Sequence, residues 1–314
     1  MKIRIRLNII KLLIISILFA ILIWGYNSYN QKRSEFLGED KTLTIGTHKR
    51  IFYTKTGSVE NEGTLIAFGW QGSYAYDVAN YITDATNLFK EVILPETLGK
   101  SGIEAKECCD KLRYSKGWNL GTDCCGYTNS ENISDISYID KVINSIDKKK
   151  IYLLGFDNGA DFILKLMCEG NIKAENVFLF YNQPPQYFCP INNRLNNTQN
   201  ITFFIKDYGK IKFWQYLADN KTSQNKTVYE INKLNKVFNL NSCVEKYDFS
   251  YLSETFEPQN PIKNYSQLLC KNNLTIKVFS LENSYSDVFF DANLRKGILQ
   301  DLSNQTIEKN EPNH

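Results

Sequence analysis

The sequence predicts an α/β fold, in which a mostly parallel sheet carries helices on both faces, behind one N-terminal apolar helix. Short, almost continuously apolar runs alternate with segments of helical spacing, which is typical of parallel strands buried on both faces. Of the 314 residues, 43% are hydrophobic and 23% charged, which is enough apolar material for a core. The net charge of +3 shows no sign of a nucleic-acid footprint, so no such partner is expected.

Residues 9–26 are apolar with three exceptions and follow a basic stub, residues 1–8. A helix of about 18 residues spans roughly 27 Å, close to the hydrocarbon thickness of a bilayer. The positive-inside rule therefore predicts a single-pass signal-anchor with a cytoplasmic N-terminus and an extracytoplasmic body. The alternative is a cleaved signal peptide and secretion, although no A-x-A-like site follows Trp24.

We expect a linker over 27–42, a domain over 43–302 and a flexible tail over 303–314. The expected strands are Leu43–Thr47, Arg50–Thr54, Thr64–Trp70, Glu91–Thr97, Lys150–Phe156, Asn176–Asn182, Ile201–Asp207 and Thr275–Leu281. Thr47-His48-Lys49 is expected to be the turn of a first hairpin. The expected helices are Tyr74–Phe89, Ser134–Ile146, Asn158–Glu169 and, on weaker patterns, Lys226–Val237 and Asp287–Leu302. The stretches 98–132 and 239–273 have little regular pattern and are predicted to be disulfide-stapled insertions.

An even number of cysteines in an extracytoplasmic domain predicts disulfides, although eight cysteines allow many pairings. They are Cys108, Cys109, Cys124, Cys125, Cys168, Cys189, Cys243 and Cys270. No C-x-x-C pair occurs, so neither a metal site nor a cofactor is expected. Eight N-x-S/T sequons are candidate glycosylation sites if the source is eukaryotic or viral. They are Asn132, Asn196, Asn200, Asn220, Asn225, Asn264, Asn273 and Asn304.

The segment Gly155-Phe156-Asp157-Asn158-Gly159 follows the strongest predicted strand and opens a helix. Glycines at both ends allow a sharp strand-to-helix turn, which holds the middle side chain out at the head of the sheet. This is the pattern of the nucleophile elbow, G-x-S-x-G. Here an aspartate, Asp157, occupies the nucleophile position.

Residues 64–301 resemble secreted polyhydroxybutyrate depolymerases and feruloyl esterases of the α/β-hydrolase fold. The resemblance rests on the segments WNLGTDCCG (118–126), DISYI (135–139), DNGA (157–160), LMCE (166–169) and NLNSC (239–243). These segments are similar to the family's W-N-x-G-x-C-C-G loop, D-V-x-F-I helix start, S-N-G-A elbow, L-A-C-E segment and N-G-C segment. The resemblance implies the disulfides Cys168–Cys189 and Cys243–Cys270, and bonds within the 108–125 segment.

The family's catalytic residues are incomplete in this chain. The family acid corresponds to Asp207, but the segment that carries the family's histidine corresponds to residues 282–287, which contain none. The two histidines of the chain, His48 and His314, are expected far from the carboxyl ends of the central strands. Loss of a general base costs about 10²–10⁴-fold in rate, and loss of a whole triad about 10⁶-fold. The chain is therefore predicted to be an inactive pseudo-esterase that binds an ester or glycan ligand or serves as a subunit of a membrane assembly.

Two alternatives keep a different chemistry. The chain could be an active carboxylic-ester hydrolase in which Asp157 attacks and Glu282, Asp287 or Tyr285 serves as the base. It could also be a carbohydrate-binding module. In that case its sugar platform would consist of Trp70, Trp118 and Trp214.

The resemblance also implies the remains of an oxyanion hole, formed by the backbone N–H groups of Trp70 and Asn158. An unpartnered buried carboxylate would need donors. We therefore hypothesise that the Asp157 carboxylate fills this site itself and accepts hydrogen bonds from these two N–H groups.

Overall fold

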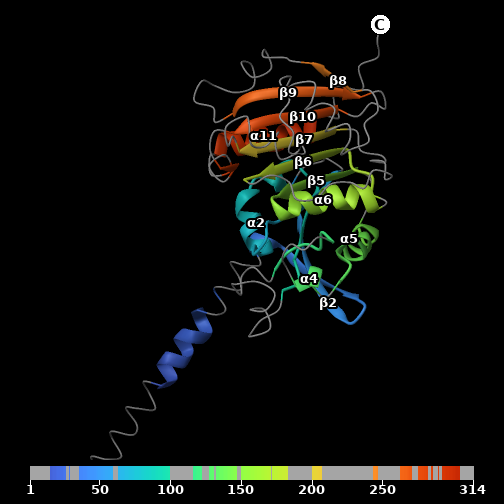
Figure 1. Ribbon diagram of the computed structural model, residues 1–314. Helices are drawn as coiled ribbons and strands as arrows, with labels where there is room; N and C mark the ends of the chain where they lie inside the picture. The colour runs from blue at the N-terminus through green and yellow to red at the C-terminus, as the bar shows by residue number, and fades with distance from the viewer. Residues whose placement is uncertain are drawn as a thin grey trace, which may run out of the picture.

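One mixed sheet organises the part of the chain that the computed structural model describes (Figure 1). The described residues are 15–25, 28, 35–58, 63–99, 116–121, 127–130, 132–146, 150–170, 172–182, 200–206, 243–246, 262–270, 275–281, 284–285, 289 and 292–304. Their strands make a ten-stranded sheet in the order β1-β2-β4-β3-β5-β6-β7-β10-β9-β8.

The six central strands are parallel, and antiparallel strands close both edges. The parallel strands are β4 (Glu91–Pro95), β3 (Gly63–Phe68), β5 (Lys150–Phe156), β6 (Asn176–Tyr181), β7 (Asn200–Lys206) and β10 (Thr275–Leu281). The edge strands are β1 (Glu39–Ile45) and β2 (His48–Thr56) on one side and β9 (Ile262–Cys270) and β8 (Cys243–Lys246) on the other. Parallel strands align their carboxyl ends, so the residues that follow β3, β5, β6 and β10 meet at one end of the sheet.

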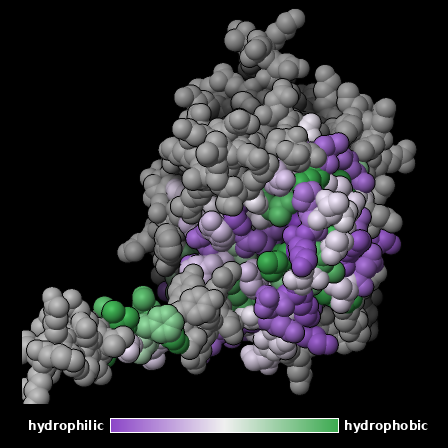
Figure 2. All heavy atoms as spheres, turned by 90° about the horizontal axis from the view of Figure 1, so that it is seen from below, coloured by the Kyte–Doolittle hydropathy of each residue, from purple (hydrophilic) through white to green (hydrophobic). Residues whose placement is uncertain are grey.

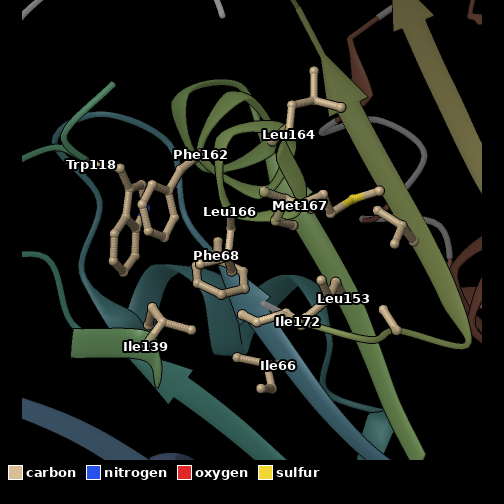
Figure 3. Close-up of a cluster of buried hydrophobic side chains, with 14 of the residues drawn as sticks. Ile66, Phe68, Trp118, Ile139, Leu153, Phe162, Leu164, Leu166, Met167 and Ile172 are labelled. Carbon is tan, nitrogen blue, oxygen red and sulfur yellow. The ribbon is translucent and has the colours of Figure 1, made fainter. Parts of the chain in front are cut away.

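Helices cover both faces of this sheet, as the sequence predicts. One core contains residues of α5 (Asp135–Asn144) and α6 (Asn158–Glu169), and the other contains residues of α2 (Ala75–Tyr81) and α11 (Ala292–Asn304). Successive residues of a central strand enter opposite cores, as Leu65 and Ile66 do in β3. Figure 3 shows part of the first core, where Trp118 lies against Phe162 of α6. This arrangement explains why the central strands are continuously apolar.

Several expected boundaries are wrong. The first hairpin turns at residues 46–47, because β2 already begins at His48. The helix expected over 74–89 ends at Tyr81, and only a short 3-10 turn, η1 (Ala85–Asn87), follows. Ile82 and Thr83, two β-branched residues with low helix propensity, stand at that break. The expected linker is also shorter, because Leu37 is buried in the core and β1 starts at Glu39.

The insertion expected over 239–273 contains two strands that the sequence pattern does not reveal, β8 and β9. They extend the sheet beyond β10 as antiparallel edge strands. Their residues alternate polar and apolar types irregularly, unlike the central strands. In the other insertion, the described part includes one short helix, α4 (Tyr127–Ser130).

Residues 15–25 form an apolar helix that stands apart from the sheet (Figure 1), and its side chains are green in Figure 2. Its large side chains are exposed, among them Phe19 (64%), Leu22 (70%) and Trp24 (73%). Within the described ranges, no helix has the length and hydropathy needed to cross a bilayer. The predicted membrane span, 9–26, extends beyond the described residues on its N-terminal side.

Two glycines allow α6 to pack closely on the sheet. A Cβ atom added at Gly159 would lie 2.5 Å from the carbonyl oxygen of Gly69 and 2.6 Å from that of Phe68. A Cβ atom at Gly155 would lie 2.7 Å from the Cα atom of Ala160. Real Cβ atoms do not approach backbone atoms this closely, so the helix could not keep its position with larger residues at these sites.

We expect Gly159→Ala to lower the free energy of unfolding by about 1–3 kcal/mol, because α6 must move away from β3. Gly297→Ala in α11 is the matched control. Its added Cβ meets no atom within 4 Å, so it should raise stability by about 0.5–1 kcal/mol. Denaturant unfolding of both variants measures the two effects, and a Gly159→Ala variant as stable as the wild type would contradict this packing.

Candidate functional site

Asp157 occupies a strained turn between β5 and α6. Its backbone has φ 45° and ψ −111°, a conformation that residues other than glycine rarely adopt. The turn is held by the Asp157 N–H, which donates to the Phe180 carbonyl (2.7 Å), and by the Asp161 N–H, which donates to the Asp157 carbonyl (3.0 Å). Such strain costs of the order of 1–3 kcal/mol and persists only when its surroundings impose it.

The predicted nucleophile elbow is therefore present as a backbone structure, at the carboxyl end of β5. The elbow occurs in a sheet whose centre is parallel, in the order β4-β3-β5-β6-β7-β10, and whose strand β2 is antiparallel to β4. Helices cover both faces of this sheet. The chain has the α/β-hydrolase fold. What distinguishes it is the side chain that the elbow presents.

Both oxygens of the Asp157 carboxylate accept hydrogen bonds. The backbone N–H of Asn182, just after β6, donates to Oδ1 at 2.7 Å. The hydroxyl of Tyr285, in the segment after β10, donates to Oδ2 at 2.8 Å. The carboxylate therefore has one backbone donor and one side-chain donor, which satisfies a half-buried charge.

Asn182, just after β6, is also bonded through its side chain to the segment after β10. Its Oδ1 accepts hydrogen bonds from the Ser284 hydroxyl (2.8 Å) and from the Tyr285 backbone N–H (3.2 Å). Asp157, Asn182, Ser284 and Tyr285 together make what we call the Asp157 network. It ties the elbow and the end of β6 to the segment that follows β10.

The Tyr285 ring fills the space beside the elbow. It is 3% exposed, and its centroid lies 5.3 Å from that of Phe156, 6.2 Å from that of Tyr81 and 6.4 Å from that of Phe180. Burial, followed by the neighbouring Asp157 charge, raises the pKa of the Tyr285 hydroxyl above its usual value. Tyr285 is therefore a protonated hydrogen-bond donor to the Asp157 carboxylate.

Two donors to the Asp157 carboxylate, the Asn182 N–H and the Tyr285 hydroxyl, differ from the ones that the oxyanion-hole hypothesis names. The hypothesis that the carboxylate also accepts from the N–H groups of Trp70 and Asn158 stays a prediction. The Asn158 side chain has a structural partner, because its Oδ1 accepts from the Trp118 N–H at 2.7 Å.

The loop that contains Trp118 and Asn119 supports the elbow from the other side. The Trp118 ring is fully buried and stacks on Phe162, with ring centroids 4.8 Å apart (Figure 3). Its Nε1 donates to the Gly69 carbonyl at 3.1 Å. The Asn119 Nδ2 donates to the carbonyls of Thr128 and Ile133. These contacts assign a structural role to the W-N segment on which the family resemblance partly rests.

A buried ion pair anchors this loop to the sheet edge. Nη1 of Arg50 in β2 lies 2.7 Å from Oδ1 of Asp135 in α5, and both side chains are inaccessible to solvent. The other oxygen of Asp135 accepts from the Asn119 N–H at 2.7 Å. Burial raises the pKa of Asp135, while the Arg50 charge opposes that shift. The guanidinium also lies 4.1 Å from the centre of the Tyr138 ring.

The tryptophans do not form the expected sugar platform. Trp118 is inaccessible, and Trp70 is half-buried against Tyr81 and Phe156, with centroid distances of 5.2 and 6.2 Å. Trp214 lies outside the described residues. Trp70 and Trp118 are therefore packing residues.

His48 lies at the start of β2, and the centroid of its ring lies 6.4 Å from that of the Tyr127 ring. Because β2 is antiparallel to β4, His48 lies toward the carboxyl ends of the central strands, contrary to expectation. It is nevertheless three strands from β5, roughly 14 Å across the sheet. This lateral separation places it away from Asp157.

Other candidate residues lie outside the described residues, namely Asp207, Glu282, Asp287 and His314. The same holds for Cys108, Cys109, Cys124, Cys125 and Cys189. Cys168 is disulfide-bonded. Cys243 and Cys270 are direct Cα partners across β8 and β9, and their disulfide stays a prediction.

The described sequons differ in their surroundings. Asn132 is exposed in a left-handed turn, with φ 50°. The Nδ2 of Asn200 donates to Oδ1 of Asn176 at 2.9 Å, and Thr202 of its sequon is buried, so this environment does not suit a glycan. Asn264 and Asn304 belong to β9 and α11. Asn196, Asn220, Asn225 and Asn273 fall outside the described ranges.

Sequence reasoning missed Asn182 and Ser284, and it named Tyr285 only as an alternative base. One signal was available for Asn182, because a polar residue at the carboxyl end of the strand beside the elbow strand is well placed to reach the site. No comparable signal marks Ser284.

Comparisons with known proteins find distant likenesses among solved structures. No family model and no curated protein matches the chain. The chain is similar to the structure of an alpha-beta serine hydrolase homologue from Coxiella burnetii, with 11% identity, a TM-score of 0.46, and coverage of 85% of this chain and 97% of that one. It is also similar to a dienelactone hydrolase from Anabaena variabilis, with 13% identity, a TM-score of 0.37, and coverage of 54% and 73%.

A membrane phospholipase A, described as a bacterial virulence factor, is similar at 13% identity and a TM-score of 0.40. The alignment covers 60% of this chain and 55% of that one, so this chain spans about half the length of the phospholipase. At such identities and TM-scores these likenesses add nothing to the argument from strand order. The narrower resemblance to polyhydroxybutyrate depolymerases and feruloyl esterases stays a prediction.

The environment of three tyrosines predicts an alkaline titration. Burial raises the pKa of Tyr138, Tyr181 and Tyr285 above the usual value of about 10. As pH rises above 10, the unfolded chain loses these protons and the folded chain keeps them, so stability falls on the alkaline side. We expect absorbance at 295 nm to show that these three of the 19 tyrosines ionise only with unfolding. Ionisation of all 19 near pH 10 in an intact fold would contradict their burial.

Proposed function

We propose that this protein is a membrane-anchored, extracytoplasmic α/β-hydrolase-like protein that does not hydrolyse esters and acts by binding, as a subunit of a membrane assembly or as the receptor of an ester or glycan ligand. The single observation that carries the loss of activity is the hydrogen bond from Tyr285 to Asp157, at 2.8 Å. The side chain at the nucleophile position is therefore a hydrogen-bond acceptor, and the Tyr285 hydroxyl donates to it.

Chemistry at this site would need a free nucleophile and a base. An aspartate nucleophile that attacks the alkyl carbon of an ester forms an alkyl ester intermediate and displaces the carboxylate product. A base must then activate water to hydrolyse that intermediate. Neither described donor to Asp157 can do so, because Asn182 contributes a backbone N–H and Tyr285 a hydroxyl with a raised pKa. The Tyr285 ring also packs beside the elbow, with its centroid 5.3 Å from that of Phe156.

The membrane anchor and the extracytoplasmic location rest on the apolar stretch 9–26 and the basic residues before it. The exposed side chains of 15–25 fit this proposal, because a helix with apolar residues on all sides requires an apolar environment. The disulfide at Cys168 fits an oxidising compartment.

One observation favours the alternative, an active ester hydrolase with an altered nucleophile. The elbow keeps its strained conformation at Asp157, and strain of this kind is commonly associated with function. In the inactive account, the same strain is maintained because the Asp157 network and the close packing of α6 depend on it.

An assay of the full chain in detergent, with short-chain aryl esters as substrates, tests the proposal. We expect the wild type, Asp157→Ala and Asp157→Ser to match the buffer blank. The serine variant should remain inactive because the base is missing, which costs on the order of 10⁶-fold when the catalytic unit is broken. Repeated turnover by the wild type that Asp157→Ala abolishes would refute inactivity and favour the ester hydrolase.

A further inference from the structure

Exposed aromatic residues gather where the chain enters the domain. Outside the apolar helix, the described residues include three exposed large hydrophobic side chains: Tyr74 (50%), Tyr76 (46%) and Ile51 (38%). The two tyrosines lie just before and within the first turn of α2. Tyr76 contacts Phe36, with ring centroids 5.0 Å apart, and Phe36 lies just before the buried Leu37, where the chain joins the core.

Two lysines accompany these rings. Lys55 donates to the Phe36 carbonyl at 3.4 Å, and its Nζ lies 5.9 Å from the centre of the Phe36 ring. The Nζ of Lys116 lies 4.1 Å from the centre of the Tyr74 ring. We call Phe36, Tyr74, Tyr76, Lys55 and Lys116 the entry patch.

The charge of the patch is largely balanced. Lys116 forms an ion pair with Glu96, and Glu96 also accepts from the Ala75 N–H at the start of α2. Asp77 accepts from the Tyr74 N–H at 2.9 Å. The patch therefore offers half-exposed tyrosines and long amphipathic lysines rather than a strong positive field. This is the composition of protein surfaces at the lipid headgroup level, where aromatic rings and lysine stems reach both apolar and polar surroundings.

We propose that the entry patch rests in the headgroup layer of the same bilayer that holds residues 9–26. This inference rests on the proposed membrane anchor. Phe36 follows the end of that stretch by ten residues, which span at most about 36 Å when fully extended. A tether of this length makes contact with the membrane an intramolecular event, so a small patch is sufficient for it.

The contact would also orient the site. α2 follows β3 at the carboxyl end of the sheet, where the elbow lies, and Tyr81 of the same helix packs against Tyr285. Contact at Tyr74 and Tyr76 therefore places the helix that borders Tyr285 next to the membrane.

Photolabelling of the full chain in phosphatidylcholine vesicles tests this inference. One probe is a phosphatidylcholine with a diazirine at the end of an acyl chain, and the other carries the diazirine in the headgroup. Peptide mapping by mass spectrometry then locates the adducts. We expect the acyl probe to label residues 9–26 and the headgroup probe to label the peptides that contain Phe36 and residues 74–76.

Three variants make the result specific. Tyr74→Ser with Tyr76→Ser should lower headgroup labelling at the Phe36 peptide severalfold. Tyr74→Trp with Tyr76→Trp should keep it, because tryptophan also favours the interface. Ile51→Ser, at the exposed hydrophobic residue outside the patch, is the matched control and should leave the labelling unchanged.

The outcomes separate the two proposals. Acyl labelling of 9–26, with headgroup labelling of the patch no higher than at Ile51, would overturn the entry patch and leave the anchor standing. Absence of acyl labelling in 9–26 would overturn the anchor and the patch together. The ester assay judges the loss of activity independently of both.

Discussion

The hydrogen bond between Tyr285 and Asp157 is the interaction on which the rest of the site depends. A half-buried carboxylate at the head of a sheet is costly without donors, and the strained backbone of the elbow holds it there. The segment after β10 supplies the missing donor, and Asn182 supplies the other. Because Asn182 also binds that segment through its side chain, the carboxylate and the segment hold each other in place.

This constraint accounts for a nucleophile-elbow framework built around a side chain that accepts hydrogen bonds. The glycines at 155 and 159 keep α6 within contact distance of the sheet, and the Trp118 loop supports the helix start through Asn158. In an esterase, the same parts position a nucleophile. Here they position an acceptor for Tyr285, so the framework has a structural use that requires no reaction.

The sequence predicts the parts of this arrangement that depend on local pattern. The apolar runs give the central parallel strands, and Gly155 to Gly159 give the elbow. The strands β8 and β9 escape sequence reasoning because their residues do not form a continuous apolar run. The partner of Asp157 was beyond sequence reasoning, because Tyr285 lies 128 residues away and its hydroxyl direction depends on how the segment after β10 folds. Trp118 suggested a ligand platform, although a buried ring that donates to the Gly69 carbonyl has a packing role.

A double-mutant cycle tests the central claim most directly. Asp157→Asn, Tyr285→Phe and the combined variant would be unfolded by denaturant in detergent beside the wild type. The account predicts that the effects of the single substitutions do not add, with a coupling free energy of about 1.5–3 kcal/mol, as expected for a hydrogen bond to a charged group. A cycle of Asp157→Asn with Ser145→Ala, at the end of α5, should be additive. A coupling near zero between Asp157 and Tyr285 would contradict the account.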